Sequence, residues 1–520
     1  MSDPGDRPYA VQKLATGIES FDLIAEGGLP QNRTTLVAGT AGSGKTVFAV
    51  QFLAAGIAAG ESGVFVTFEE SPRDIRQNMR SFGWDLVQWE QDGILALVDA
   101  SPDPEIETIE SGSFDLSALL ARVENAVRKV GAKRVAIDSL GAMFSQFSDQ
   151  SIVRRELFRI AIALKELGVT AVMTAERTED YGAIARFGVE EFIADNVMIL
   201  RNVLGEERRR RTVEILKFRG TGHQKGEFPF TIVADHGFVV IPLSSIQLRQ
   251  KSSEVRISSG NPELDGMCGG GFFRDSVILV SGATGTGKTL TVTQFLAGGG
   301  AAGERCLLLS FEESRDQLFR NARGWGMDLE GMEKDGLLRV VCDYPEVASL
   351  EDWLVRIKAQ VHDFRPSRVA LDSLSALERG GSLKAFREFV IGVSSFIKHQ
   401  EITGLFTATT AGLMGGPSIT GNHISTLTDS IILLRYVEAF GEMKRGMTVL
   451  KMRGSDHDKE IREFTIDQDG MHLGRPFRNV TGILAGAPVH VSPGDIERIW
   501  SHLDPEAGAE EPQATPAQSD

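Results

Sequence analysis

Two short segments of this 520-residue chain have the residue types and spacing of a phosphate-binding loop. Gly39–Thr46 and Gly282–Thr289 both fit the pattern G-x-x-x-x-G-K-[ST], between an apolar run and a stretch of helical character. Glycines let backbone N–H groups turn inward around an anion, and the start of the following helix adds a favourable dipole. The alternative is a glycine-rich turn with an incidental lysine. The residues expected to bind ATP are Gly42, Ser43, Gly44, Lys45 and Thr46 in the first loop and Gly285, Thr286, Gly287, Lys288 and Thr289 in the second.

A phosphate loop binds a nucleotide, but phosphoryl transfer also needs a carboxylate that prepares the attacking oxygen. The pair Glu69 and Glu70 follows an apolar run, and the pair Glu312 and Glu313 follows another at the same distance from its loop lysine. Residues at the carboxyl ends of parallel strands lie beside the ligand in such folds. We expect these four glutamates to be catalytic, and a solvated loop start is the alternative.

A third acidic position follows a strand-like run in each half of the chain. Asp138 ends Val-Ala-Ile, and Asp372 ends Val-Ala-Leu. In phosphate-loop enzymes such an aspartate and the hydroxyl that follows the loop lysine hold a magnesium ion. The sequence therefore predicts Mg²⁺ near Thr46 and Asp138 in one half and near Thr289 and Asp372 in the other.

Two basic pairs recur as Lys-x-Arg-Gly: Lys217 with Arg219, and Lys451 with Arg453. Because side chains alternate along a strand, both cations of a pair lie on one face. Such a pair could clamp a triphosphate, and in a ring it could do so from the neighbouring subunit. The alternative is a solvated hairpin edge whose charges deter aggregation. A separate run, Arg208–Arg211, is expected to form a charged loop or a subunit contact.

The chain is a tandem duplication, because all of these motifs recur in the same order. Lys45 and Lys288 are 243 positions apart, and after a small deletion Asp138 and Asp372 are 234 apart. The two copies differ at one informative position. Glu191 and Phe192 in the first copy face Ser425 and Thr426 in the second. Only the second copy has hydroxyls that could accept a phosphoryl group, although a Ser-Thr pair also suits a helix start.

Short β-branched runs alternate with helical patterns in each copy, which predicts an α/β fold with a mainly parallel sheet flanked by helices. Expected strands include Ser276–Ser281, Val64–Phe68, Val135–Ile137, Val169–Thr174 and Val197–Leu200, and Ser151–Leu167 has helical spacing. Later runs, at Thr212–Lys217, Phe230–Val233 and Phe238–Ile241, predict antiparallel edge hairpins. The expected domains are 1–247 and 261–481, with a linker at 248–260, a C-terminal regulatory segment at 482–503 and a disordered tail at 504–520.

Composition narrows the class of protein. The net charge of −16 argues against a broad nucleic-acid footprint, which needs basic surface. No apolar run is long enough to span a bilayer and the N-terminus has no signal-peptide pattern, so a cytoplasmic protein is expected. Cys268, Cys306 and Cys342 have no Cys-x-x-Cys spacing and are expected to be core residues rather than a zinc site or disulfides.

The chain resembles the KaiC family of cyanobacterial circadian clock proteins from the first phosphate loop to about Val491. The resemblance is carried by Cys268–Phe273, Ser418–Asp429 and Lys451–Ser455, which are close to family signatures. It implies two RecA-like ATPase domains per chain, stacked as a double-ring homohexamer with ATP at the subunit interfaces.

The same resemblance implies ATP hydrolysis in the first ring and reversible autophosphorylation at Ser425 and Thr426 in the second. By this carry-over Glu312 is the general base for the Thr426 hydroxyl, and Glu69 prepares the attacking water. The positions that match residues touching nucleotide across the interface are Lys217, Arg219, Lys451 and Arg453.

The resemblance also implies partners: a KaiB-like protein on the first ring and a regulator at residues 482–503. The sequence departs from the family at Thr420–His423, which reads Thr-Gly-Asn-His where the family has Thr-Asp-Ser-His. The outer part of 482–503 also differs. We therefore expect the order and persistence of phosphorylation to differ.

Two other functions use the same phosphate loops. One is a RecA-type ATPase that depends on nucleic acid, which the acidic charge and the lack of a basic, aromatic-rich loop count against. The other is a nucleotide-switched scaffold without phosphoryl transfer.

Overall fold

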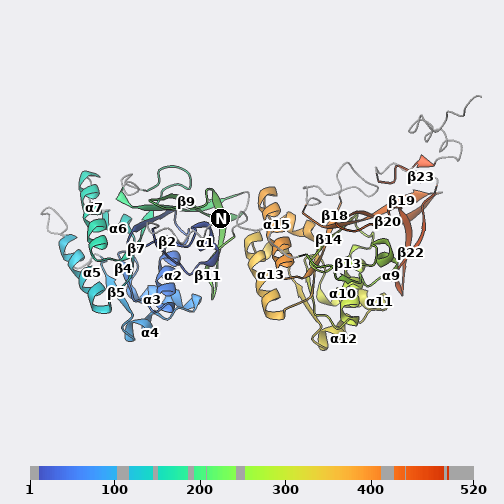
Figure 1. Ribbon diagram of the computed structural model, residues 1–520, viewed down its shortest axis with the longest axis horizontal. Helices are drawn as coiled ribbons and strands as arrows, with labels where there is room; N and C mark the ends of the chain where they lie inside the picture. The colour runs from blue at the N-terminus through green and yellow to red at the C-terminus, as the bar shows by residue number, and fades with distance from the viewer. Residues whose placement is uncertain are drawn as a thin grey trace, which may run out of the picture. The chain divides into compact units, whose positions relative to one another are not determined.

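The chain forms two compact units, Met1–Gln247 and Leu248–Asp520. Figure 1 shows that each unit is built around its own sheet with helices packed against it. The computed structural model describes residues 11–101, 116–144, 150–185, 193–205, 208–241, 252–410, 427–439, 441–478, 480–484 and 489–490.

The first unit contains a nine-stranded sheet of order β11-β10-β9-β8-β3-β7-β6-β4-β5. In this order, neighbouring strands from β8 through β3, β7, β6 and β4 to β5 pair in parallel. Strands β9, β10 and β11 extend the sheet through antiparallel pairs. The strands are β3 (Thr34–Gly39), β4 (Gly63–Thr67), β5 (Leu95–Asp99), β6 (Arg134–Asp138), β7 (Thr170–Glu176), β8 (Asn196–Leu204), β9 (Arg209–Phe218), β10 (Glu227–Val233) and β11 (Gly237–Val240), with a small pair β1 (Lys13–Leu14) and β2 (Leu29–Pro30) beside them.

Helices cover both faces of this sheet because its central strands are apolar on both sides. In β4, Val64 and Val66 pack in one core with residues of α5 and α7, whereas Phe65 packs in a second core with residues of α1 to α4. This alternation follows from the pleat of the strand. The helices are α1 (Glu19–Ile24), α2 (Lys45–Ala58), α3 (Pro72–Met79), α4 (Leu86–Gln91), α5 (Leu116–Val130), α6 (Leu140–Phe144) and α7 (Gln150–Glu166).

The second unit repeats this plan with a nine-stranded sheet of order β16-β15-β17-β18-β14-β19-β20-β21-β22. Its strands are β14 (Val277–Gly282), β15 (Cys306–Ser310), β16 (Leu338–Cys342), β17 (Arg368–Asp372), β18 (Thr403–Thr409), β19 (Ser430–Ala439), β20 (Glu442–Met452), β21 (Arg462–Asp467) and β22 (Gly470–Pro476), with the small pairs β12 (Arg256–Ile257) with β13 (Phe272–Phe273) and β23 (Val480–Thr481) with β24 (Val489–His490). Its helices are α9 (Pro262–Met267), α10 (Lys288–Ala301), α11 (Arg315–Gly324), α12 (Leu329–Lys334), α13 (Leu350–Phe364), α14 (Leu374–Glu378) and α15 (Leu383–His399).

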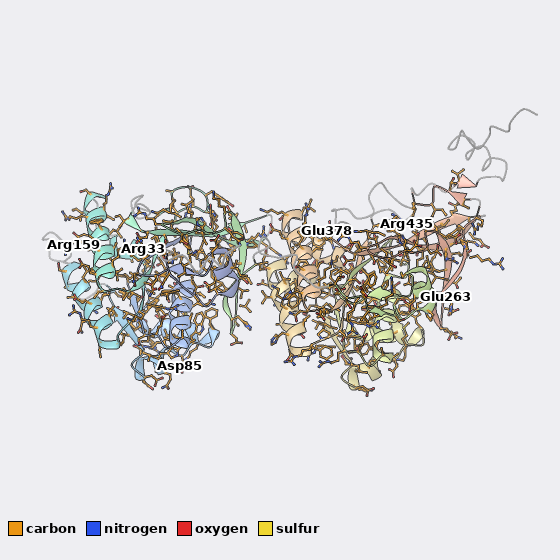
Figure 2. All side chains as sticks on the ribbon, in the orientation of Figure 1. Arg33, Asp85, Arg159, Glu263, Glu378 and Arg435 are labelled. Atoms are coloured by element: carbon orange, nitrogen blue, oxygen red, sulfur yellow. The ribbon has the colours of Figure 1, made fainter. Side chains whose placement is uncertain are left out.

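Local helix starts also recur between the units. Asp85, labelled in Figure 2, caps α4 by accepting the backbone N–H of Gln88 over 3.1 Å. Asp328 caps α12 in the same way, accepting the N–H of Gly331 over 2.8 Å. A side-chain acceptor at this position satisfies one of the free N–H groups of the first turn, so the duplicated aspartates fix where both helices begin.

The prediction of mainly parallel sheets with antiparallel edge hairpins is confirmed in both units. Arg208–Arg211 was predicted to form a charged loop or a subunit contact. The loop is wrong for the last three residues, which begin β9, and the subunit contact stays a prediction. Antiparallel pairing of Arg209–Arg211 with the end of β8 supplies backbone hydrogen bonds that composition alone did not reveal.

The structure describes the ends of the predicted domains only in part. β12 lies within the stretch expected as a linker and pairs with β13 of the second unit. The segment 482–503 is described only at 482–484 and 489–490, and the tail at 504–520 lies outside the described residues. Across the described ranges, no helix combines the length and apolar composition that crossing a membrane would need.

The three cysteines are free thiols, with Cys268 and Cys306 buried and Cys342 half-buried. Burial raises the pKa of the Cys268 and Cys306 thiols to about 12, and that of Cys342 to about 11. Only about one buried thiol in ten thousand is a thiolate at pH 8, and the thiolate is the reactive form.

We therefore expect native protein at pH 8 to resist iodoacetamide, with Cys342 the first to react. Intact mass should show three additions only after denaturation. Rapid alkylation of Cys268 or Cys306 in the folded protein would contradict the burial described above.

Candidate nucleotide sites

Each phosphate loop joins a central strand to a helix at the carboxyl edge of its sheet, the edge where the parallel strands end. The loops connect β3 to α2 and β14 to α10. Gly44 and Gly287 precede the two helices with φ of 92° and 107°, a conformation that favours glycine. A Cβ on Gly44 would also lie 2.6 Å from Ile232 Cδ1, so the Ile232 side chain would have to move to admit a larger residue. The sequence thus folds locally into an anion cradle at a helix N-terminus.

The loop lysines bind the backbone of their own loops. Lys45 Nζ donates to the carbonyl oxygens of Gly39 (3.0 Å) and Thr40 (3.2 Å), and Lys288 Nζ donates to those of Gly282 and Ala283, both at 3.0 Å. Burial lowers the pKa of both lysines. A triphosphate would offer these partly desolvated cations a stronger, charged acceptor.

The hydroxyl after each loop lysine meets the predicted metal-site aspartate. Thr46 Oγ1 donates to Asp138 over 2.7 Å, and Thr289 Oγ1 donates to Asp372 over 2.8 Å. A second threonine, Thr407 at 2.5 Å, also donates to Asp372, and burial raises the pKa of this aspartate. Within the described ranges no three His, Cys, Asp or Glu side chains could hold a metal by themselves. The hydroxyl and carboxylate nevertheless fit a magnesium ion that keeps water and phosphate oxygens as its other ligands.

The glutamate pair of the first unit lies directly beyond β4. Ser139 Oγ donates to Glu69 over 3.1 Å, and Asn78 donates to Glu70 over 3.2 Å. Partial burial, and after it the nearby Glu176 carboxylate, raise the pKa of Glu69. Burial and then Asp138 raise the pKa of Glu70. Both carboxylates are therefore stronger bases than ordinary glutamates, which suits proton abstraction.

In the second unit the matching pair lies beyond β15 with different neighbours. Asn321 donates to Glu313 over 3.0 Å, as its counterpart does in the first unit. Glu312 instead faces a cation, since its carboxylate lies 3.5 Å from the Arg379 guanidinium. Burial and then Asp372 raise the pKa of Glu313. The two sites share their framework but differ in the charges around the first glutamate.

The Lys-x-Arg pair of the second unit lies at the amino edge of the sheet, where the parallel strands begin. Ile278 near the start of β14 pairs with Ser430, which pairs with Met452, the residue between Lys451 and Arg453. The phosphate loop leaves the other end of β14, whose six residues span roughly 20 Å. This distance is longer than either side chain, so the pair does not reach the phosphate loop of its own unit.

The first unit has the same geometry. Thr35 near the start of β3 pairs with Asn196, and Asn196 pairs with Phe218, between Lys217 and Arg219. The antiparallel return of β9 is the cause, because it brings the end of that strand back to the amino edge. Sequence reasoning placed both cations on one face but could not assign the edge.

An aspartate anchors the pair in the first unit. Asp195 is 1% exposed, pairs with Lys165 at 2.9 Å and lies 3.7 Å from the Arg219 guanidinium. Lys217 Nζ donates to the carbonyl oxygen of Ala194 over 2.8 Å. Arg219 itself is half exposed.

The second unit repeats this anchor. Asp429 pairs with Lys398 at 2.7 Å and lies 3.8 Å from the Arg453 guanidinium. Lys451 Nζ donates to the carbonyl oxygen of Thr428 over 2.7 Å. The recurrence of Asp195 as Asp429 shows that the anchor belongs to the duplicated plan, although its role was not predicted.

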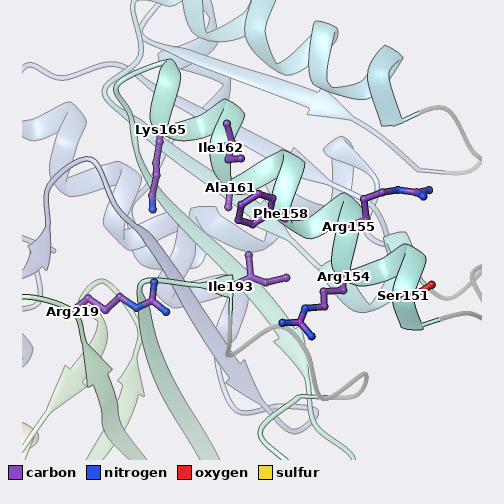
Figure 3. Close-up of a pocket in the computed structure, with 9 residues that line it drawn as sticks. All are labelled: Ser151, Arg154, Arg155, Phe158, Ala161, Ile162, Lys165, Ile193 and Arg219. Atoms are coloured by element: carbon purple, nitrogen blue, oxygen red, sulfur yellow. The ribbon is translucent and has the colours of Figure 1, made fainter.

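A pocket of about 490 Å³ lies along α7 and ends at Arg219 (Figure 3). Two of its apolar side chains are exposed, Phe158 by 58% and Ile162 by 39%. The pocket thus combines uncovered apolar surface with cations. Its lining residues are Ser151, Arg154, Arg155, Phe158, Ala161, Ile162, Lys165, Ile193 and Arg219.

Four predicted positions fall outside the described part of the chain: Glu191, Phe192 and the acceptors Ser425 and Thr426. Glu176 belongs to the first site but was missed, because the strand was expected to end at Thr174 and in fact continues to Glu176. No sequence signal marks this end, because the register of β7 with β3 sets it.

Comparison with known proteins matches both units to one family. The family model described as KaiC, an ATPase, matches residues 14–245 and 257–476. The circadian clock protein KaiC3 of Synechocystis sp. is 65% identical over 494 residues, which cover 95% of this chain and 98% of the relative.

Two further relatives are circadian clock oscillator proteins named KaiC. That of Thermosynechococcus vestitus is 59% identical over 493 residues, covering 94% of this chain and 95% of the relative. That of Synechococcus elongatus is 58% identical over 484 residues, covering 93% of each.

Proposed function

Because the chain belongs to the KaiC family of ATPases, we propose that it is an ATP-hydrolysing serine/threonine autokinase. Hydrolysis takes place in the first unit, and reversible self-phosphorylation at Ser425 and Thr426 takes place in the second. The names of its relatives support a role in circadian or other timing control.

The observation that carries this proposal is the repeated arrangement at the carboxyl edge of both sheets. Each unit brings together a phosphate loop, a Thr-Asp pair and a Glu pair. Only the second copy has hydroxyl residues at the position of Glu191 and Phe192. The same chemistry therefore has water as its acceptor in one unit and a protein hydroxyl in the other.

Each side chain has a task in this proposal. Lys45 and Lys288 bind the β- and γ-phosphates, while Glu69 and Glu312 accept the proton of the attacking oxygen. Glu70 and Glu313 support them. A magnesium ion held at the Thr-Asp pairs neutralises phosphate charge when bound.

A neighbouring copy is needed to complete each site, because the Lys-x-Arg pairs lie at the opposite edge of the sheet from the loops. The described chain resumes at Leu427. On this same amino edge, the carbonyl oxygen of Thr428 accepts a hydrogen bond from Lys451 Nζ. A double-ring hexamer would bring the amino edge of one subunit to the loop of the next. The exposed Phe158 and Ile162 beside Arg219 fit burial in that contact.

Two partners are part of the proposal. A KaiB-like protein would bind the first ring, and a regulator would bind the segment at 482–503. Phosphate at Ser425 or Thr426 adds about two negative charges, which can reorganise nearby cations and so report the state of the ring.

The direct test is incubation of the full-length protein with ATP labelled on its γ-phosphate. Ser425→Ala combined with Thr426→Ala should remove more than about nine tenths of the label, because these two hydroxyls accept the γ-phosphoryl group. Phosphate release from the first unit should persist. Undiminished label in the double variant would exclude these acceptors.

A RecA-type ATPase that depends on nucleic acid is not favoured, since the chain carries a net charge of −16. That function would require hydrolysis to rise with single-stranded DNA and fall steeply with salt. A nucleotide-switched scaffold would give no label at all.

A further inference from the structure

Glu176 is the last residue of β7 and pairs in register with Gly39, the residue that opens the first phosphate loop. The N–H of Arg177 donates to the carbonyl oxygen of Gly39 over 3.1 Å, and Lys45 Nζ donates to the same oxygen over 3.0 Å. The Glu176 carboxylate also interacts electrostatically with Lys45 and with Glu69. It therefore belongs to the group of charges at the γ-phosphate end of the loop.

The Glu176 side chain rests against α6 at a position without a side chain. A Cβ added to Gly141 would lie 3.4 Å from Glu176 Cγ and 3.5 Å from its Oε2. These are ordinary van der Waals distances, so an alanine Cβ would already touch the Glu176 side chain. Glycine at 141 thus places no side chain against the carboxylate on this side.

The second unit changes both positions together. Thr409 pairs in register with Gly282, as Glu176 does with Gly39. Ser375, the second residue of α14 as Gly141 is of α6, accepts the N–H of Thr409 at its hydroxyl over 2.8 Å. In the second unit, Thr409 held by Ser375 thus takes the place that Glu176 has beside Gly141 in the first.

This difference matches the acceptors proposed for the two units. Water has two O–H groups, and both must be directed away from phosphorus when its oxygen attacks. A serine or threonine hydroxyl has one O–H, which a single carboxylate can accept. Two converging carboxylates therefore suit water, and one suits a protein hydroxyl.

We propose that Glu176 is a catalytic residue of the first unit, where it accepts one O–H of the attacking water while Glu69 accepts the other. The water oxygen bonds to the γ-phosphorus, the bond to the β–γ bridging oxygen breaks, and its electron pair leaves with ADP. Glu69 takes one proton, and the other stays on the released phosphate, hydrogen-bonded to Glu176. This step rests on the hydrolysis proposed above for the first unit.

The test is steady-state hydrolysis by full-length protein whose second unit carries Glu312→Gln and Glu313→Gln. In that parent, Glu176→Gln should lower kcat at least tenfold and leave KM for ATP within twofold, because orientation of water is lost and nucleotide binding is not. Glu176→Asp should recover part of kcat. The matched control is Glu179→Gln, the same charge change at an exposed position on the following loop, which should retain the parental rate.

A kcat within twofold of the parent for Glu176→Gln would overturn the proposal. So would a rise in KM without a fall in kcat, which would indicate a role in binding. A parent protein that releases no phosphate would instead overturn the proposed hydrolysis in the first unit, before Glu176 is considered.

Discussion

Replacing Glu69 and Glu70 by glutamine should lower phosphate release at least about tenfold while labelling of the protein continues, because general bases contribute about 10²–10⁴. The reciprocal change, Glu312→Gln with Glu313→Gln, should abolish labelling while most phosphate release persists. Both pairs lie directly beyond a parallel strand at the carboxyl edge, so each change removes the proposed base from one unit only. Hydrolysis and labelling should be measured in the same reaction.

The two double variants control for each other, because each removes the same charges from the same structural position. Glutamine keeps the size of the side chain, and its amide can still accept from Asn78 or Asn321. If either variant abolished both activities, the division of labour between the units would be wrong. Loss of neither activity would show that other groups take the proton.

The phosphate loops could be predicted from sequence because their chemistry is local. Eight consecutive residues contain the glycines, lysine and hydroxyl, and the helix that follows depends on Gly44 or Gly287. The contact of Thr46 with Asp138 joins residues 92 positions apart. It could also be predicted, because Asp138 ends one strand and Thr46 follows the loop after another strand at the same edge.

What could not be predicted depends on pairing between distant strands. Glu176 was missed because the end of β7 is fixed by its register with β3, and β-propensity does not mark that end. The opposite placement of Arg453 and Lys288 depends on the antiparallel return of β20, which periodicity does not encode. The anchor Asp429 was visible as a repeated aspartate, but its contact with Arg453 needed the fold.

The opposite placement of Lys288 and the Lys-x-Arg pair makes a complementation experiment decisive. Lys288→Ala removes the loop lysine, and Lys451→Ala with Arg453→Ala removes the pair. Either change should lower labelling of the protein about 10³-fold, because cations that stabilise the transferring phosphoryl group contribute a factor of about this size. Mixed at equal concentration with ATP, the two variants should recover about a quarter of the normal label, since random assembly makes about one interface in four complete. If the pair acted within its own chain, no mixture could contain a complete site.

The position of the pair explains why the mixture should recover labelling. Roughly 20 Å of β14 separates the pair from the loop of its own unit, so in the proposed assembly the pair acts on nucleotide bound to a neighbouring subunit. The matched control replaces two other exposed cations, with Arg323→Ala and Lys334→Ala on the surface beside Glu330, and should label normally alone. Recovery that requires Lys451 and Arg453 on the partner of an intact Lys288 would show that each second site is shared between two chains. A mixture no more active than its separate components would contradict a site shared between two chains, and the contact of Asp429 with Arg453 would then serve its own chain only.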